Sequence, residues 1–453
     1  MIEKIATWER GKNQKLKPPI VPGLPWLGNA LGLTNDFVGF LVKSYQEFGS
    51  IFRVNVPNQS FTIIAGSEAN NFMSQVGDNY LTLDEIWKSY SQEYGTDVFI
   101  SRMEGAAHRH LRQVLNRGYS REAILAHLPL LVKTTEQMTD QWQIGQRIKV
   151  IDIIRQLVVR QLGLALANYE SDDYFHDLRH FFCVNINVAF KGWSEKALRR
   201  RDYLKAKARV MELGRKLIAN HRAIPPIDRE RNFIDDLLES TDENGQPFSE
   251  VALIPQVLSP FLGGMETTAN ICTFMLFALL NNPDVLDRVT AEIDAVLAEQ
   301  RLSASALREM KSLHGTAMET LRMYPSSPVL PRSARESFEF AGYSVERGEQ
   351  VMVATSVCHF LPQFFPNPYT FDIDRYHEPR NEHQQPGVYA PFGLGAHVCL
   401  AKRMTEIQIM TLMATLLSRV KLEIDPPTYK LKTIYNPNLC PKNFWVRLVE
   451  RRQ

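Results

Sequence analysis

The stretch that decides the fold is Pro391-Phe392-Gly393-Leu394-Gly395-Ala396-His397-Val398-Cys399-Leu400-Ala401, near the C-terminus. A turn-forming run with two glycines leads to a single cysteine, and apolar residues at helical spacing follow directly, from Leu400 to Leu417. Cys399 is therefore predicted to lie at or just before a helix N-terminus. The N–H groups and positive end of a helix lower the pKa of a thiol, so a thiolate is expected there.

The residues before the cysteine suit a large, flat ligand. Gly393 and Gly395 let the backbone pass close to such a group, and His397 supplies a hydrogen-bond donor. Phe392 can pack beside the sulfur. Haem iron that activates oxygen is bound by one protein thiolate, while the macrocycle occupies other positions on the metal. An isolated cysteine is more often a small buried apolar residue, so this interpretation depends on the whole pattern.

The pattern Phe-x-x-Gly-x-His-x-Cys resembles the haem-binding signature of the cytochrome P450 superfamily. Ala401 stands where that family most often has glycine, and alanine is small enough to keep a close approach to a porphyrin. The resemblance implies haem b (iron protoporphyrin IX) as cofactor, with Cys399 as the iron ligand. The residues that it places against the cofactor are Phe392, Gly393, His397 and Ala401.

A second motif, residues 261–268, lies in the most apolar window of the chain. Adjacent glycines in a helix cost about 1 kcal/mol each relative to alanine, so helix stability does not explain Gly263 and Gly264. They leave room for a planar group and oxygen, or else form a notch for helix packing. The stretch resembles the family's oxygen-activation motif, Gly-Gly-x-acid-Thr. The resemblance makes Glu266 and Thr267 the catalytic pair that passes protons from solvent to bound oxygen.

A basic pair follows Gly105. His108 and Arg112 are four residues apart and share a helix face, a spacing suited to one anionic group. Taken alone, such a pair is more often a solvated basic face. The resemblance assigns both side chains to the haem propionates, together with Arg332 and His397.

A third motif places Glu319 and Arg322 three residues apart on a predicted helix. Most such pairs are exposed and contribute little. Followed by Met323-Tyr324-Pro325, the pair resembles the family's structural helix pair. Residues 371–376 resemble the segment that supplies a third member, Arg375. Asp374 and Tyr376 differ from the residues usual in that segment.

Composition and length limit the class of protein. The chain has 453 residues, a 44% apolar composition and a net charge of +2, so no charge argument supports a nucleic-acid partner. Its five cysteines are odd in number and widely spaced, without a secretory signal, so a reducing, bacterial cytoplasm is expected. No apolar run is long enough for a transmembrane segment. We expect a leader with a proline-rich segment over residues 1–29 and one haem-thiolate monooxygenase domain over 30–453.

Periodicity predicts a mainly α fold. The expected helices and strands are a helix over 37–48, strands over 50–56 and 60–65, several helices between 122 and 300, one of them long and ending at Asn281, a strand over 350–357 and a hairpin over 433–448. The resemblance implies the cytochrome P450 fold, a triangular helical domain with a small β-rich lobe. Residues 80–104 fit equally a mobile loop over a pocket and a packed connection.

The resemblance implies a monooxygenase that inserts one oxygen atom from O2 into an apolar small molecule, by hydroxylation or epoxidation. Terpenoids, steroids and fatty acids all fit the largely apolar set of positions predicted to contact substrate. These positions are Leu83, Phe99, Leu262, Ser327 and Val329. Two alternatives remain: a peroxide-using or isomerising haem-thiolate enzyme, and a non-catalytic haem sensor.

The chain carries no Gly-x-Gly-x-x-Gly fingerprint and no fused reductase segment. Electrons must then come from a separate ferredoxin-type or flavodoxin-type donor with its NAD(P)H reductase. The predicted docking residues are Arg109, Arg117, Lys402 and Arg403. A monomer is expected.

Overall fold

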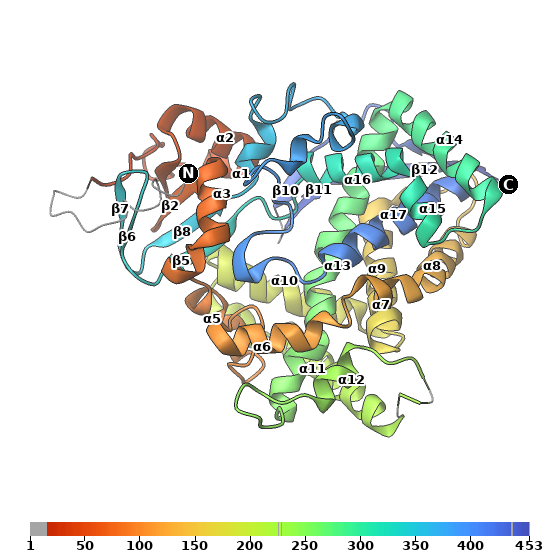
Figure 1. The fold of residues 1–453 in the computed structure, drawn as a ribbon, viewed down its shortest axis with the longest axis horizontal. Helices are drawn as coiled ribbons and strands as arrows, with labels where there is room; N and C mark the ends of the chain where they lie inside the picture. The colour runs from red at the N-terminus through yellow and green to blue at the C-terminus, as the bar shows by residue number, and fades with distance from the viewer. Residues whose placement is uncertain (1–15, 225, 228, 436–437, 453) are drawn as a thin grey trace. The chain divides into compact units, whose positions relative to one another are not determined.

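The computed structural model describes residues 16–224, 226–227, 229–435 and 438–452. It is mainly helical with small sheets, as predicted (Figure 1). Contacts divide the chain into two compact units. The first unit contains residues up to 86 with 328–368 and 383–398, and the second contains 87–327, 369–382 and the chain from 399 onward. That residues 30–453 form one domain stays a prediction.

The first unit is built on a five-stranded sheet in the order β1-β2-β8-β5-β3. Its strands are β1 (Ile51–Val56), β2 (Gln59–Ala65), β3 (Leu81–Thr82), β5 (Leu330–Ala334) and β8 (Gln350–Ala354). The other elements are α1 (Ala30–Asn35), α2 (Phe37–Phe48), α3 (Gly66–Gln75), α4 (Gly77–Tyr80), the hairpin β6 (Phe338–Phe340) and β7 (Tyr343–Val345), and the 3-10 turns η3 (Val357–Phe360) and η6 (Gly395–His397). The predicted helix over 37–48 and the first two strands are confirmed within one residue.

The proline-rich segment runs extended along this sheet. The backbone N–H of Val21 donates to the carbonyl of Arg53 in β1 at 2.9 Å. The prediction of an extended segment is therefore confirmed for residues 18–23 but is wrong for 24–28, where Leu24 and Gly28 pair across a tight turn. Residues 1–15 of the predicted leader lie outside the described residues.

The second unit holds most of the helices. They are α6 (Gly105–Asn116), α7 (Arg121–Ala126), α8 (Leu128–Asp140), α9 (Val150–Ala167), α10 (Phe175–Lys191), α11 (Arg201–Ala223), α12 (Phe233–Glu239), α13 (Glu250–Asn281), α14 (Pro283–Glu299), α15 (Ala304–Glu309), α16 (Lys311–Met323) and α17 (Lys402–Arg419). The 3-10 turns η1 (Asp172–Tyr174), η2 (Glu195–Arg199) and η4 (Ile373–Tyr376) connect them, while α5 (Asp84–Gln92) and η5 (Glu382–Gln384) divide between the two units.

Two small sheets complete the second unit. One is the hairpin of β10 (Thr433–Tyr435) and β11 (Leu439–Pro441), and the other has the order β4-β12-β9, with β4 (Arg147–Lys149), β9 (Val420–Ile424) and β12 (Trp445–Arg451). The hairpin predicted over 433–448 is therefore shorter, because β12 leaves β11 and pairs with β9 and β4. Periodicity identifies a strand but not its partner.

The long helix α13 ends at Asn281, as the sequence predicts. Ser249 caps it by accepting a hydrogen bond from the N–H of Ala252 at 3.3 Å, and Pro283 follows its end. Pro260 within the helix has no N–H for the carbonyl of Gln256. Ser259 replaces that bond, since its Oγ donates to the Gln256 carbonyl at 2.7 Å. The helix therefore tolerates an interior proline just before its glycine pair.

The segment that follows α5 is a packed connection. The ring of Phe99 stacks on Tyr90 at a centroid distance of 5.3 Å and meets Trp87 edge-on at 5.7 Å. The Nε2 atom of Gln256 in α13 donates to the carbonyl of Val98 at 2.6 Å. Of the two alternatives for residues 80–104, the structure favours the packed one for this part.

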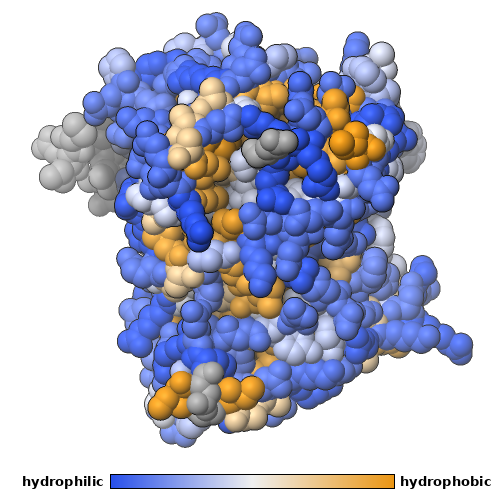
Figure 2. Space-filling model, turned by 90° about the vertical axis from the view of Figure 1, so that its right-hand side faces the viewer, coloured by the Kyte–Doolittle hydropathy of each residue, from blue (hydrophilic) through white to orange (hydrophobic). Residues whose placement is uncertain are grey.

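The molecular surface is largely polar. Figure 2 shows a face covered mostly by hydrophilic residues, with hydrophobic side chains visible between them. Among the residues that the structure describes, none of the helices combines the length and the apolar character needed to cross a membrane.

Candidate active site

The predicted site residues divide between the two units. The first unit carries Leu83, Val329, Arg332, Phe392, Gly393 and His397. The second carries Phe99, His108, Arg112, Leu262, Gly263, Gly264, Glu266, Thr267, Ser327, Cys399 and Ala401, together with Glu319, Arg322 and Arg375. Each group is described within its own unit.

The loop that leads to the cysteine is shaped by its glycines. Gly393 and Gly395 have φ angles of 77° and 75°, in the left-handed region that favours glycine. The carboxylate of Asp78 accepts a hydrogen bond from the N–H of Ala396 at 2.7 Å. Glycine geometry and one carboxylate thus fix the backbone of the loop.

Cys399 lies just before α17, as predicted. Ala401 is the N-cap residue of this helix, and its backbone N–H donates to the Cys399 sulfur. Burial nevertheless raises the pKa of the thiol, while the Ala401 N–H and the positive charges of Arg112 and Lys402 act in the opposite direction. Burial thus opposes the effect of the helix N-terminus on this thiol, and the expected thiolate stays a prediction. A bound metal cation deprotonates a coordinating thiol outright.

Two features of the second unit fit a planar cofactor held by a thiolate. The side chain of Cys399 has exposed surface, so its sulfur is open to a ligand. Gly263 is exposed in a helix whose neighbouring residues are nearly all buried, and a Cβ atom there would meet no atom within 4 Å. A thiol donor and an open helix surface are what a haem requires.

The two glycines of α13 differ in their surroundings. A Cβ atom on Gly264 would lie 2.9 Å from Cδ1 of Leu162 in α9. Gly264 is therefore the packing notch that was the alternative interpretation of the pair, and its contact with a cofactor stays a prediction. Gly263 alone faces open space.

Glu266 has no exposed surface, and two guanidinium groups neutralise it. Nη2 of Arg155 in α9 donates to Oε2 at 2.5 Å, and Nε of Arg179 in α10 donates to Oε1 at 3.3 Å. The side chain of Arg155 is 5% exposed and that of Arg179 is 41% exposed. Arg179 therefore connects the buried carboxylate to the surface. Sequence reasoning missed both arginines, because each lies far from Glu266 along the chain.

Thr267 makes a hydrogen bond to its own helix. Its Oγ1 donates to the carbonyl of Gly263, one turn earlier, at 2.7 Å. Such back-bonding loosens the regular ladder of a helix. The hydroxyl of Thr267 and the open surface of Gly263 are therefore adjacent.

The basic pair on α6 is partly buried. His108 is 1% exposed and Arg112 is half-buried, which excludes the solvated basic face for His108. Burial lowers the pKa of Arg112, and the Cys399 sulfur raises it, so the guanidinium lies within electrostatic range of the thiol. In the first unit, Arg332 is 4% exposed in β5. That these residues bind the propionates stays a prediction.

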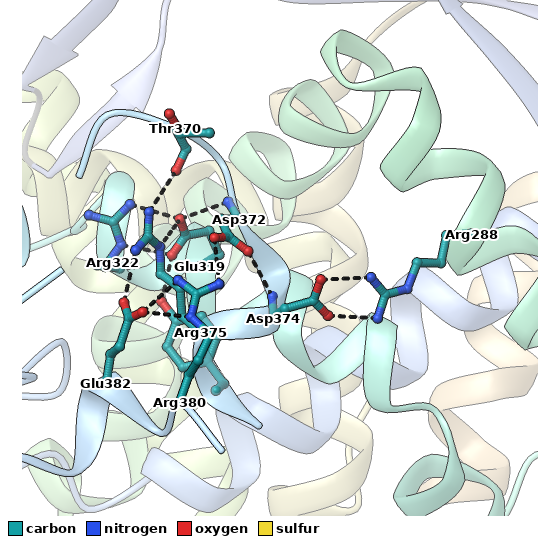
Figure 3. Close-up of polar contacts among 10 residues, drawn as sticks. Arg288, Glu319, Arg322, Thr370, Asp372, Asp374, Arg375, Arg380 and Glu382 are labelled. Carbon is teal, nitrogen blue, oxygen red and sulfur yellow. Dashed lines mark hydrogen bonds and ion pairs between the residues drawn. The ribbon is translucent and has the colours of Figure 1, made fainter. Parts of the chain in front are cut away.

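The predicted structural triad is assembled and fully buried. Arg322 donates to both oxygens of Glu319 at 2.7 Å, and Nε of Arg375 reaches Oε1 at 3.3 Å (Figure 3). Two further residues complete the cluster: the hydroxyl of Tyr376 donates to Glu319 at 2.6 Å, and Glu382 accepts from Arg375 at 2.8 Å. No sequence signal predicts the roles of Tyr376 and Glu382, because Tyr376 only differs from the residue usual in the motif.

The predicted substrate positions are mostly buried. Leu83, Phe99, Leu262 and Val329 are less than 10% exposed, and Val329 belongs to the apolar core of the first unit. The Oγ atom of Ser327 accepts from Nδ2 of Asn438 at 3.1 Å. Contact of these five residues with substrate stays a prediction.

Comparison with known families decides the assignment. The family model of cytochrome P450 matches residues 18–443. The chain belongs to the cytochrome P450 family. It is a haem b protein and a monooxygenase of apolar substrates, and the P450 fold predicted for it is confirmed.

The relatives of this P450 are distant. A sterol 14alpha-demethylase of Mycolicibacterium vanbaalenii is 26% identical over 404 residues, which covers 86% of this chain and 88% of the relative. Cytochrome P450 26A1 of Danio rerio is 25% identical and covers 94% and 90% of the two chains. The heme domain of cytochrome P450DA has a TM-score of 0.85 at 21% identity over 97% and 99%. Retinoic acid bound cyanobacterial CYP120A1 has a TM-score of 0.84 at 23% identity over 97% and 100%.

Proposed function

We propose that this P450 hydroxylates or epoxidises an apolar small molecule of the terpenoid, steroid or fatty-acid class. It takes electrons from a separate ferredoxin-type or flavodoxin-type donor with its NAD(P)H reductase. The observation that carries the proposal is the pair Glu266 and Thr267 in α13, next to the open surface of Gly263. A haem sensor or carrier would need no buried acid beside a hydroxyl.

Cys399 would bind the haem iron, and four basic residues would hold the propionates: His108, Arg112, Arg332 and His397. Haem bound through a thiolate supplies electron density that favours O–O cleavage. The polypeptide would supply the thiolate ligand and the path for protons.

The proton path proposed for this chain starts at Arg179. Arginine keeps its proton, so Arg179 cannot pass one on itself. Its single bond to Glu266 is long, at 3.3 Å, and much of its side chain is in solvent. When it swings outward, water reaches the carboxylate, which then hands protons to the Thr267 hydroxyl. Arg155 stays in place and keeps the carboxylate oriented.

The proposed substrate class rests on the apolar character of the predicted pocket positions and on the names of similar proteins. The predicted pocket positions are apolar apart from Ser327. The name of one relative refers to sterol demethylation, and one solved structure of a similar protein holds retinoic acid. A rigid isoprenoid or sterol-like molecule is therefore the first class to screen.

The donor is proposed to bind a basic surface of the second unit. Arg109 of α6, Arg117 just after its end, and Lys402 and Arg403 at the start of α17 are all exposed. Ferredoxins and flavodoxins are acidic proteins, so opposite charges favour docking. We also propose a cytoplasmic monomer.

The test combines ligand screening with Thr267→Ala. Terpenoids, steroids and fatty acids are titrated against the purified holoenzyme, and the spin-state shift of the haem identifies a ligand. With that ligand and a surrogate donor pair, Thr267→Ala should divert most NADPH consumption from product to hydrogen peroxide, while Thr267→Ser keeps product formation.

The control is Thr273→Val in the same helix, whose Oγ1 only donates to the Ala269 carbonyl at 2.7 Å. This variant should leave the ratio of product to peroxide unchanged. Turnover driven by added peroxide and indifferent to Thr267→Ala would reject the proposal in favour of a peroxide-using enzyme. Ligands that shift the spin state of the haem but are not turned over would indicate a sensor.

A further inference from the structure

The amide of Asn270 in α13 is buried without a protein partner. The residue has no exposed surface, and neither its Oδ1 nor its Nδ2 forms a hydrogen bond with any residue that the structure describes. Burying a polar group without a hydrogen bond is costly, so nearly all such groups in folded proteins are paired with protein or with water. Asn270 follows Glu266 by four residues, on the same face of the helix.

A second unpaired group belongs to the facing helix. Nη2 of Arg155 in α9 donates to Glu266, but the buried Nε of the same guanidinium has no hydrogen-bond partner in the described part of the chain. The Cys440 thiol of β11 lies close to this guanidinium, but burial raises its pKa, and a neutral thiol is only a weak acceptor. Nε therefore remains available to a better acceptor.

The packing of α9 on α13 fixes the relative direction of the two helices. Leu162 of α9 lies against Gly264. Ile154, earlier in α9, lines one small cavity together with Leu276, later in α13. The two helices thus run antiparallel, and residues before Leu162 lie beside residues after Gly264.

This direction places Arg155 and Asn270 on the same side of Glu266. Arg155 is adjacent to Ile154, so its side chain approaches the carboxylate from the later part of α13, where Asn270 lies. The two residues offer N–H donors and one carbonyl acceptor within a single buried cluster. This cluster lies beside the charge of Glu266.

We propose that Arg155 and Asn270 hold internal water beside Glu266, and that Asn270 is thereby a positioning residue for the carboxylate. Water complements the cluster because it accepts hydrogen bonds from Nε and Nδ2 and donates to Oδ1 and to the carboxylate. Internal water in proteins is bound in this way, by buried polar groups that have no protein partner.

The inference rests on the proposed proton path and deepens it. In that path Arg179 swings outward and leaves Glu266 with the guanidinium of Arg155 alone. Internal water supplies a second donor to the carboxylate at that moment. The carboxylate therefore keeps its orientation while protons pass through it, and a buried network that is fully paired is more rigid than one that is partly paired.

The first test locates the water. A crystal structure of the holoenzyme, at a resolution that shows ordered water, should place water within hydrogen-bond distance of the Asn270 amide and of Nε of Arg155. In urea unfolding, Asn270→Leu should lower the free energy of unfolding, because it removes the amide and leaves Nε unpaired. An amide with no ordered water beside it, or a leucine variant that is more stable than the unchanged protein, would overturn the water site.

The second test measures proton delivery in the holoenzyme. With a ligand identified by its spin-state shift and a surrogate donor pair, Asn270→Leu should lower the ratio of product to peroxide about tenfold and change the solvent deuterium isotope effect. Asn270→Ser keeps a polar side chain and leaves space for water, so it should restore most of the product. The control is Thr273→Val, a buried residue about one turn later in α13, which should change neither quantity.

Thr267→Ala in the same assay separates the two possible failures. If Thr267→Ala diverts NADPH consumption to peroxide and Asn270→Leu behaves as the unchanged protein, the positioning role is overturned while the proposed path stands. If Thr267→Ala leaves the ratio unchanged, the proposed path fails and the positioning role fails with it, whereas the crystal structure still decides the water site. An equal fall of the ratio in Thr273→Val would show a general packing effect and would also overturn the positioning role.

Discussion

At the scale of single residues, the most constrained group is the carboxylate of Glu266. It has no exposed surface, and its charge is balanced by one buried arginine and one half-exposed arginine. A buried charge is tolerated only when it is paired. Because Arg155 is buried and Arg179 is partly exposed, we expect a structural role for Arg155 and the proposed outward movement for Arg179.

Removing Arg155 should therefore destabilise the protein. Arg155→Leu leaves a buried carboxylate with one long bond, and we expect a loss of about 3–5 kcal/mol in the free energy of unfolding. Arg155→Leu/Glu266→Leu should recover most of that loss, since both charges are gone, yet product formation should stay low. Urea unfolding and turnover of the four proteins in this cycle measure the two effects. A double variant as unstable as the single one would contradict the ion-pair explanation.

The two glycines of α13 give a second prediction. Gly264→Ala places a methyl group 2.9 Å from Leu162 Cδ1, so overpacking of about 1–3 kcal/mol should exceed the roughly 1 kcal/mol gained in helix propensity. Gly263→Ala meets no protein atom and should keep or raise the stability of the apoprotein. The same methyl group should reduce the affinity for haem or for carbon monoxide. Unfolding curves and carbon monoxide titration distinguish the two variants, and equal behaviour would show that the glycines are equivalent.

At the scale of elements, Glu319 joins α16 to the turn η4. It receives hydrogen bonds from Arg322, Arg375 and Tyr376 and from the backbone N–H of Asp372, all in the second unit. Arg288 of α14 adds an exposed pair with Asp374, at 2.7 Å, to the same turn (Figure 3). A single buried carboxylate thus ties the turn η4 to α16.

The hydroxyl of Tyr376 should contribute measurably to this junction. Tyr376→Phe removes one hydrogen bond to a buried carboxylate, which is expected to cost about 1.5–3 kcal/mol in urea unfolding. Asp374→Asn, which weakens only the exposed pair with Arg288, should cost less than about 1 kcal/mol. If the two substitutions proved equally mild, Tyr376 would be no part of the buried cluster.

At the scale of the whole molecule, charge is distributed unevenly. The predicted donor surface, formed by Arg109, Arg117, Lys402 and Arg403, lies on the second unit. Opposite charge raises association rates by about 10- to 1,000-fold and is screened by salt. The predicted donor surface is therefore testable with a soluble donor at low and at high salt.

For the donor surface, Arg109→Glu/Arg117→Glu should raise the apparent KM for an acidic ferredoxin or flavodoxin roughly tenfold and remove most of its salt dependence. The kcat at saturating donor should change little, since neither side chain is placed at the reaction centre. Arg301→Glu/Arg308→Glu serves as the charge-matched control. An unchanged KM in the first variant would reject these residues as the docking site.

The sequence by itself determined the family and the bounds of several helices and strands, and it predicted roles for Cys399, Glu266 and Thr267. These features depend on residues close together in the chain, such as Gly393 to Cys399, whose spacing carries the information. Tertiary structure alone decided that Arg155 and Arg179 neutralise Glu266, that Tyr376 joins the buried cluster, and that only one of two adjacent glycines is open. It also reversed the expected pKa shift of Cys399, because burial depends on the whole fold, whereas helix position can be read locally.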